Sequence, residues 1–175
     1  DADLQKHDTS RYQIKTLVAD TVIDNSGRVV RKFYRYIRKD ATKAWEVKDL
    51  WTAVIDGDKA ELVEENQRKV KLIFKPTKDK EWNINMFNNL SEKVAKYSGI
   101  NEAKTINGLS FSSTVTVDEE IYETKIDTRR KYEVYAKNVG MISKYYKDVI
   151  FQFNNPALPT KGEEYYYNVV SYGVQ

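Results

Sequence analysis

The sequence predicts a mainly β protein, built as a curved antiparallel meander sheet or a partly open β-barrel with one short helix. Three observations lead to this fold class. Stretches of alternating polar and apolar residues recur along the chain, with turn-forming residues between them. The connections are short, which favours antiparallel neighbours. Aromatic residues make up 13% of the chain, and its 13 tyrosines suit half-buried strands.

The first half of the chain contains five predicted strands. They cover residues 12–23, 28–38, 45–55, 60–65 and 68–75. The loops at residues 24–27 (Asp-Asn-Ser-Gly) and 56–58 (Asp-Gly-Asp) are typical of turns, because Asp and Asn cap turns and Gly accepts a positive φ. In the fifth strand Val70, Leu72 and Phe74 alternate with lysines, and only Ile73 breaks the pattern.

The pattern changes between residues 83 and 100. Leu90, Val94 and Tyr97 follow one another at spacings of four and three, and Gly99 supplies a stop signal. We therefore expect the one short helix of the protein here.

Strand character returns in the second half. Asn107-Gly108 is a strong hairpin signal. Strands are expected over residues 109–117, 119–126, 131–139, 141–153 and 164–174, with a tight turn at Asp118. A meander of about ten strands must curl or close, because long twisted sheets do not stay flat.

The domain organisation follows from length and composition. Residues 1–10 are expected to form a flexible polar leader, and residues 11–175 a single antiparallel β domain. A chain of this size buries roughly 70% of its unfolded surface, so it needs no disulfide or metal to form a core. The chain has no cysteine, which excludes disulfide and thiol chemistry.

The overall charge excludes one class of partner. The formal net charge is only +3, and the basic run from Arg28 to Arg38 alternates with aromatic and aliphatic residues as a strand does. A polyanion-binding protein usually carries a concentrated basic face. We expect no nucleic-acid partner.

No constellation of residues points to catalysis, a cofactor or a metal. His7 is the only histidine, so histidine-based zinc sites and triads lack a second member. The scattered glycines form no phosphate loop, and the two acidic turns lack the full spacing of a calcium loop. The acidic pairs Glu64-Glu65 and Glu119-Glu120 point to opposite faces of a strand, so a carboxylate-dependent hydrolase would need acids from different strands.

Aromatic side chains are the candidates for ligand binding: Trp45, Trp51, Trp82, and Tyr166 within the run Tyr165-Tyr166-Tyr167. Exposed aromatic rings stack on sugars, and inward-facing rings line apolar pockets. The alternative is that these residues form core and cross-strand pairs, which stabilise sheets.

Several segments together resemble a known group of proteins. These are residues 34–40 (Tyr-Arg-Tyr-Ile-Arg-Lys-Asp), Trp45, residues 51–53 (Trp-Thr-Ala), residues 61–70, residues 105–109 (Thr-Ile-Asn-Gly-Leu) and residues 135–142 (Tyr-Ala-Lys-Asn-Val-Gly-Met-Ile). The chain resembles uncharacterised outer-membrane and periplasmic lipoproteins of Bacteroidetes-type bacteria. Residues 135–142 are also similar to carrier-like periplasmic proteins with an unclosed barrel. The resemblance implies export, a lipid anchor and a place at the outer membrane or cell surface, and it supplies no catalytic residues.

We therefore expect a monomeric, non-catalytic module of the cell envelope. Its partner is expected to be a small apolar or sugar ligand or an envelope protein, with membrane contact only through a lipid anchor. A protein-interaction or scaffold module of the envelope is the first alternative. A carboxylate-dependent hydrolase is the second, and it requires two acids converging in a cleft.

Overall fold

The computed structural model describes residues 8–153 and 155–174, so His7 and most of the predicted leader lie outside the described residues. The chain divides into two compact units. Unit 1 holds the residues up to Phe74 together with residues 84–91, and unit 2 holds residues 75–83 and those from Glu92 onward. Each unit contains one antiparallel sheet. The single domain expected over residues 11–175 stays a prediction.

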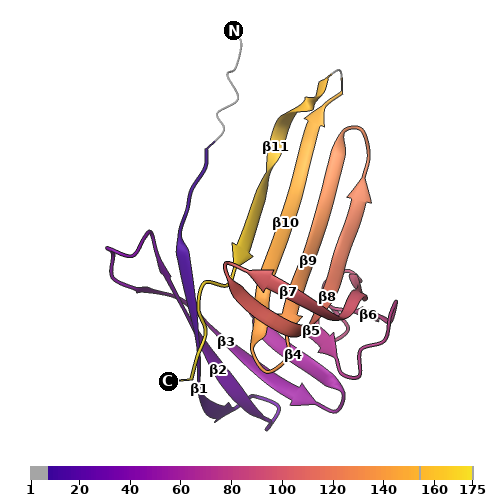
Figure 1. Cartoon of the computed structure of the whole chain (residues 1–175). Coiled ribbons are helices and arrows are strands. Elements are labelled where there is room, and N and C mark those ends of the chain that lie inside the picture. The colour runs from indigo at the N-terminus through magenta and orange to yellow at the C-terminus, as the bar shows by residue number, and fades with distance from the viewer. Residues whose placement is uncertain (1–7, 154, 175) are drawn as a thin grey trace. The chain divides into compact units, whose positions relative to one another are not determined.

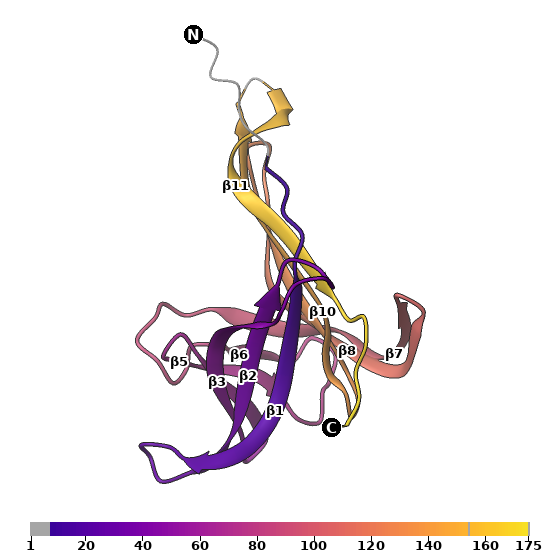
Figure 2. The same cartoon turned by 90° about the vertical axis from the view of Figure 1, so that its left-hand side faces the viewer.

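Unit 1 is a five-stranded meander with the strand order β1-β2-β3-β4-β5. The strands are β1 (Gln13–Ile23), β2 (Val29–Arg38), β3 (Glu46–Asp56), β4 (Lys59–Glu64) and β5 (Gln67–Ile73). Figure 2 shows β1, β2 and β3 side by side. The five strands predicted for the first half of the chain are confirmed, with ends that differ by one or two residues.

A β-bulge in β3 changes which side chains share a face of this sheet. Arg35 pairs with Asp49, whereas the next residue of β2, Tyr36, pairs with Val47. Lys48 is therefore the extra residue of the bulge. Because side chains alternate along a strand, one extra residue reverses the parity of every position beyond it.

A second bulge lies between β4 and β5. Glu61 pairs with Val70, and Ala60 pairs with Leu72, so the intervening residue of β5 is unopposed. Ile73 then joins Val70 on one face, and both are buried. The residue that broke the sequence alternation is thus a core residue, because the bulge shifts the strand by one position.

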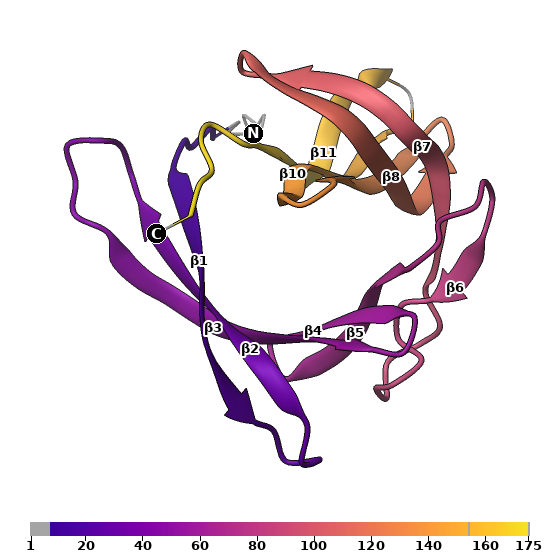
Figure 3. The ribbon, with the colours of Figure 1, turned by 60° about the horizontal axis from the view of Figure 1, so that its bottom comes forward.

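Unit 2 is a six-stranded meander with the order β11-β10-β9-β8-β7-β6. Its strands are β6 (Glu81–Asn83), β7 (Val94–Ile106), β8 (Leu109–Glu123), β9 (Asp127–Ala136), β10 (Gly140–Gln152) and β11 (Asn155–Asn168). Figures 1 and 3 show the long strands β8 to β11 and the curved β7–β8 hairpin. The predicted Asn107-Gly108 turn joins β7 to β8, and both residues have positive φ, as a two-residue hairpin loop requires.

The mainly β, antiparallel prediction is confirmed, whereas the helix expected between residues 83 and 100 is wrong. No helix occurs in the described residues. The segment that carries Leu90 is irregular, and strand β7 begins at Val94. Within β7, Ala95, Tyr97 and Gly99 are buried in alternation with more exposed neighbours, which is the period of a strand. Val94 and Tyr97 therefore lie on opposite faces.

Further boundaries in unit 2 differ from the prediction: β9 begins at Asp127 and β11 at Asn155, earlier than the expected residues 131 and 164. The tight turn at Asp118 is not formed, because β8 continues to Glu123 with an irregular register next to Asp118. The last strand ends at Asn168, so residues 169–174 continue beyond it without regular structure. Neither sheet closes on itself: one ends at β1 and β5, the other at β6 and β11.

Each unit has its own buried apolar residues. In unit 1 these are Val30, Val70, Ile73 and Ile84, and the backbone amide of Val70 donates to the carbonyl of Ile84. In unit 2 a cluster of Phe111, Val134, Ala136 and Ile142 is extended by half-buried neighbours such as Tyr132 and Val169. Burial of this apolar surface is the main stabilising term for either sheet.

Candidate functional site

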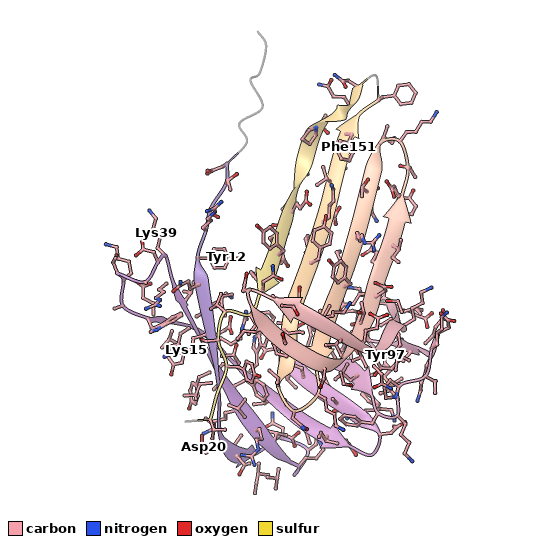
Figure 4. All side chains as sticks on the ribbon, viewed as in Figure 1. Tyr12, Lys15, Asp20, Lys39, Tyr97 and Phe151 are labelled. Carbon is pink, nitrogen blue, oxygen red and sulfur yellow. The ribbon has the colours of Figure 1, made fainter. Side chains whose placement is uncertain are left out.

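The four aromatic candidates are dispersed over both units. Trp45 and Trp51 belong to unit 1, and Trp82 and Tyr166 belong to unit 2. Trp82 is only 5% exposed, and its ring centre lies 4.8 Å from that of Tyr97, which is labelled in Figure 4. Trp82 is therefore a residue of the unit 2 core.

Tyr166 is an exposed ring on β11, with 69% of its surface accessible. It pairs with Tyr145 on β10. The ring of Tyr145 stacks on Tyr132 at 5.3 Å, and its hydroxyl donates to Glu164 at 2.6 Å. Burial, together with this hydrogen bond, raises the pKa of Tyr145 to about 12, so the hydroxyl stays protonated at neutral pH.

Trp51 forms a closed contact on one face of the unit 1 sheet. The guanidinium carbon of Arg35 lies 3.6 Å from the centre of the Trp51 ring. Asp49 neutralises Arg35, accepting from its Nη1 at 3.1 and 3.0 Å. The indole Nε1 of Trp51 is buried and has no hydrogen-bond partner. Asp49 also accepts from Lys48 Nζ at 2.6 Å, so one carboxylate serves two cations beside the Trp51 ring.

Trp45 carries a second arginine stack, on the opposite face. The guanidinium carbon of Arg38 lies 4.2 Å from the centre of the Trp45 ring. Arg35 and Arg38 are three residues apart on β2, so their side chains leave opposite faces of the strand. Trp45 and Trp51 would share a face in a regular strand, and the bulge at Lys48 separates them.

Three more residues lie around this stack. We call the whole group the Trp45 surface, and it consists of Gln13, Lys15, Tyr36, Arg38 and Trp45. Lys15 Nζ lies 4.6 Å from the centre of the Tyr36 ring and 5.1 Å from that of Trp45. Arg38 Nε donates to Gln13 Oε1 at 2.6 Å. The pairing of Gln13 with Arg38 and of Lys15 with Tyr36 places these side chains on one face. Figure 4 labels Lys15 on β1.

The Trp45 surface carries two cations and no acid. Within the described part of the chain, neither Lys15 nor Arg38 forms an ion pair. The acid that follows Arg38 in the sequence, Asp40, accepts from the hydroxyl and the amide of Thr42, and these bonds, with a smaller electrostatic contribution from Arg38, lower its pKa. Asp40 acts on Arg38 from beyond ion-pair distance, so within the described chain it leaves the guanidinium without a direct carboxylate contact. Glu46 pairs with Ile37, and therefore lies on the face of β2 opposite to Arg38.

Unit 2 has an aromatic and charged face that the sequence did not reveal. Tyr165 stacks on Tyr146 at 4.7 Å and on Tyr167 at 5.3 Å, and Lys131 Nζ lies 4.5 Å from the centre of the Tyr146 ring. Because the strand alternates, these rings lie on the face opposite to Tyr166. The cation beside these rings, Lys131, forms ion pairs with acids of unit 2, whereas Lys15 and Arg38 of the Trp45 surface form none with the described residues.

The acids around Lys131 bear on the hydrolase alternative. Glu120 lies 3.1 Å and Asp148 3.8 Å from Lys131 Nζ, so these carboxylates from β8 and β10 converge on one ammonium group. Arg129 also lies within 4.0 Å of both. Both carboxylates are thus paired with cations of their own unit. The cluster therefore has the character of an ion-pair network.

A buried carboxylate occurs in unit 1. The side chain of Glu61 is 1% exposed and accepts from Arg28 at 2.8 Å and from Arg68 at 2.7 and 2.9 Å. Burial raises its pKa, but the bonds from the two arginines outweigh burial and hold the pKa below its ordinary value. Glu61 is thus ionised and saturated with donors.

The two acidic turns behave as the sequence predicts. Asp24 Oδ1 accepts from the amides of Ser26 and Arg28 at 2.9 Å each, and Gly27 has a positive φ. In the described part of the chain, no three histidine, cysteine or acidic side chains gather as metal ligands. The same residues contain no helix long and apolar enough to span a membrane.

Sequence reasoning named Trp45 as a candidate but did not name the polar residues that surround it. Gln13, Lys15 and Arg38 come from β1 and β2, and only the register brings them beside Trp45. The one available signal was the alternation of basic and aromatic residues in the segment Tyr34 to Arg38. Comparison of this chain with protein-family models, curated proteins and solved structures finds no match.

Proposed function

We propose that this protein is a non-catalytic binding module of the bacterial cell envelope, and that the Trp45 surface is where it binds its ligand. The observation that carries the proposal is the arrangement of Tyr36 and Trp45 with Lys15 and Arg38 on one sheet face. Aromatic rings beside hydrogen-bond donors are the usual equipment of a site for a small polar ligand such as a sugar.

The location in the cell rests on the sequence resemblance to exported lipoproteins. An extracytoplasmic site, at the periplasm or the cell surface with a lipid anchor to the outer membrane, belongs to the same proposal. So do a monomeric state and a partly open β-barrel. The absence of cysteine from the chain is compatible with an oxidising compartment.

The experiment that tests the function is native mass spectrometry of the protein purified gently from a bacterial envelope. The expected result is a bound small molecule at near-stoichiometric amount, released by denaturation and reduced in the Trp45→Ala variant. Trp82→Phe serves as a control for general disturbance, because Trp82 lies in the unit 2 core. A ligand-free mass for wild-type protein that still folds would count against the proposal.

A second candidate function, a protein-interaction module of the envelope, is favoured by a different surface. In unit 2 the β8–β9 turn is joined to the end of β10 by the amide of Phe151, which donates to the carbonyl of Ile126 at 2.8 Å (Figure 1). Large apolar side chains are exposed around this contact: Ile121, Tyr122, Ile126, Ile150 and Phe153. Clusters of exposed apolar residues mark partner surfaces.

Cross-linking separates this candidate from the first. A photoreactive residue in place of Phe153, which is 83% exposed, is expected to capture one envelope protein if the module binds a partner there. The same group in place of Tyr36 should then capture none. Capture of many unrelated proteins at Phe153, or of none, would remove the support for this second function.

A further inference from the structure

The two arginine–tryptophan stacks of unit 1 differ in one respect. Arg35, stacked on Trp51, is neutralised by both oxygens of Asp49. Arg38, stacked on Trp45, faces the neutral Gln13, and its ion-pairing position is filled by no carboxylate of the described chain. The same sheet thus contains a completed stack and one that lacks its anion.

We propose that a ligand supplies this anion: the Trp45 surface binds a saccharide that carries an oxyanion, either a carboxylate or a phosphate. The inference rests on the proposed function and names the ligand class for the same site. Charge complementarity carries it, because Lys15 and Arg38 lie on one face without an acid from β1, β2 or β3 beside them. The rings of Tyr36 and Trp45 offer apolar contact to the sugar.

The geometry of Arg38 suits this role. A guanidinium stacked on a ring keeps its N–H groups in the plane, where they reach an oxyanion in a two-pronged contact. Nε is occupied by Gln13 Oε1 at 2.6 Å, and the two Nη groups make no hydrogen bond within the described chain. Gln13 and Trp45 therefore fix the guanidinium plane and leave its outer donors for the ligand.

A substitution at Gln13 can test whether the ligand supplies the anion, because glutamate has nearly the same shape as glutamine and carries a negative charge. In the Gln13→Glu variant a carboxylate replaces the amide that touches Arg38, which reproduces the internal neutralisation that Asp49 gives to Arg35. We expect this variant to lose binding of the acid ligand while the two rings stay in place. Arg38→Gln removes the charge directly. Arg31→Gln is the matched control, because it removes the same charge from the opposite face of β2.

The measurement is NMR titration of the three tryptophan indole resonances, with Trp51 and Trp82 as internal references. The probes are a trisaccharide of galacturonic acid, its neutral methyl ester, glucose 6-phosphate and inorganic phosphate. We expect the acid trisaccharide or glucose 6-phosphate to shift the Trp45 signal. The affinity should fall about tenfold or more in Arg38→Gln and Gln13→Glu, and by less than about twofold in Arg31→Gln. The preferred probe distinguishes a carboxylate from a phosphate.

Two outcomes overturn the inference. If the ester binds as tightly as the acid and Gln13→Glu changes neither affinity, the site binds a saccharide whatever its charge. The proposed function then stands and the anion assignment fails. If no anionic probe moves the Trp45 signal, or if inorganic phosphate binds without dependence on Arg38, the anion assignment fails. The envelope purification described above then decides the proposed function independently.

Discussion

At the two arginine–tryptophan stacks of unit 1, the local charge depends on which residue pairs with the arginine. Asp49 lies opposite Arg35, and Gln13 lies opposite Arg38. A carboxylate and an amide have nearly the same shape, so the difference between a closed and an open stack is one of charge. One substitution at Gln13 that introduces a carboxylate would neutralise Arg38, and one at Asp49 that removes the carboxylate would leave Arg35 without it.

The same reasoning at Glu61 gives a prediction about stability. Glu61→Gln leaves Arg28 and Arg68 without the carboxylate that both now share at 2.7 to 2.8 Å. Arg28 keeps its ion pair with Asp24 at 2.8 Å, whereas Arg68 keeps only a contact with Asp56 at 3.9 Å, so part of the charge loses its compensation. We expect the free energy of unfolding to fall by about 2–4 kcal/mol. Urea unfolding at neutral pH measures this. Asp20→Asn, which breaks an exposed pair with Lys32, should leave the free energy of unfolding almost unchanged.

The lowered pKa of Glu61 also predicts that the stability of the protein depends on pH. Because its pKa in the folded protein lies below the ordinary 4.5, its contribution to stability is complete above that pH and is lost as the pH falls through the folded pKa. Unfolding curves from about pH 7 to about pH 3 should therefore lose stability more steeply in the wild type than in Glu61→Gln. Parallel acid profiles of the two proteins would contradict this role.

At the scale of elements, the sequence predicted the five strands of unit 1 and part of the strands of unit 2, and it missed β6 and β7 and the continuation of β8 through Asp118. Alternation and turn residues identify a strand, because they depend on near neighbours alone. A bulge depends on the partner strand as well. The one at Lys48 could not be read from β3, and it decides that Trp45 and Trp51 lie on opposite faces.

The missing helix has the same physical origin. Leu90, Val94 and Tyr97 have helical spacing, but they do not share a buried face: Leu90 and Val94 are exposed, and Tyr97 is fully buried. The alternation that governs the segment is that of Ala95, Tyr97 and Gly99, in which the small residues gave little hydrophobic signal. Pairing of β7 with β8 therefore overrides a weak local pattern.

The β10–β11 hairpin depends on one glycine of its edge strand. Gly162 pairs with Val149 and has φ +133°, a conformation that other residues rarely adopt. A Cβ there would collide with the carbonyl of Asp148 and lie 2.7 Å from the Cα of Val149. We expect Gly162→Ala to destabilise the hairpin by about 2–3 kcal/mol.

Amide hydrogen exchange of β11 measures this effect, because an edge strand can open without the rest of the sheet. Exchange should accelerate for β11 and change little in β7 and β8. Gly173→Ala is the control, since a Cβ at Gly173 meets nothing within 4 Å. Equal exchange rates in the two variants would show that the strand accommodates the side chain.

At the scale of the whole molecule, the two units are interleaved along the chain. Unit 1 ends at Phe74, resumes for residues 84–91 and then gives way to unit 2. The resumed segment is held in unit 1 by hydrogen bonds, among them Asn88 Nδ2 donating to the carbonyl of Arg68 at 2.8 Å. Both ends of that segment continue directly into unit 2. Sequence patterns predict each sheet, but they contain no signal for this exchange.

This interleaving predicts cooperative unfolding. When unit 1 unfolds, the segment 84–91 is released. The strands β6 and β7 of unit 2, which this segment connects, then lose their anchored link, so unfolding of unit 1 also destabilises unit 2. The tryptophans report on both sheets, with Trp45 and Trp51 in unit 1 and Trp82 in unit 2. In urea, the three ¹⁹F signals of fluorotryptophan-labelled protein should share one midpoint. A separate midpoint for Trp82 would show two independent domains and would overturn the expectation of a single domain over residues 11–175.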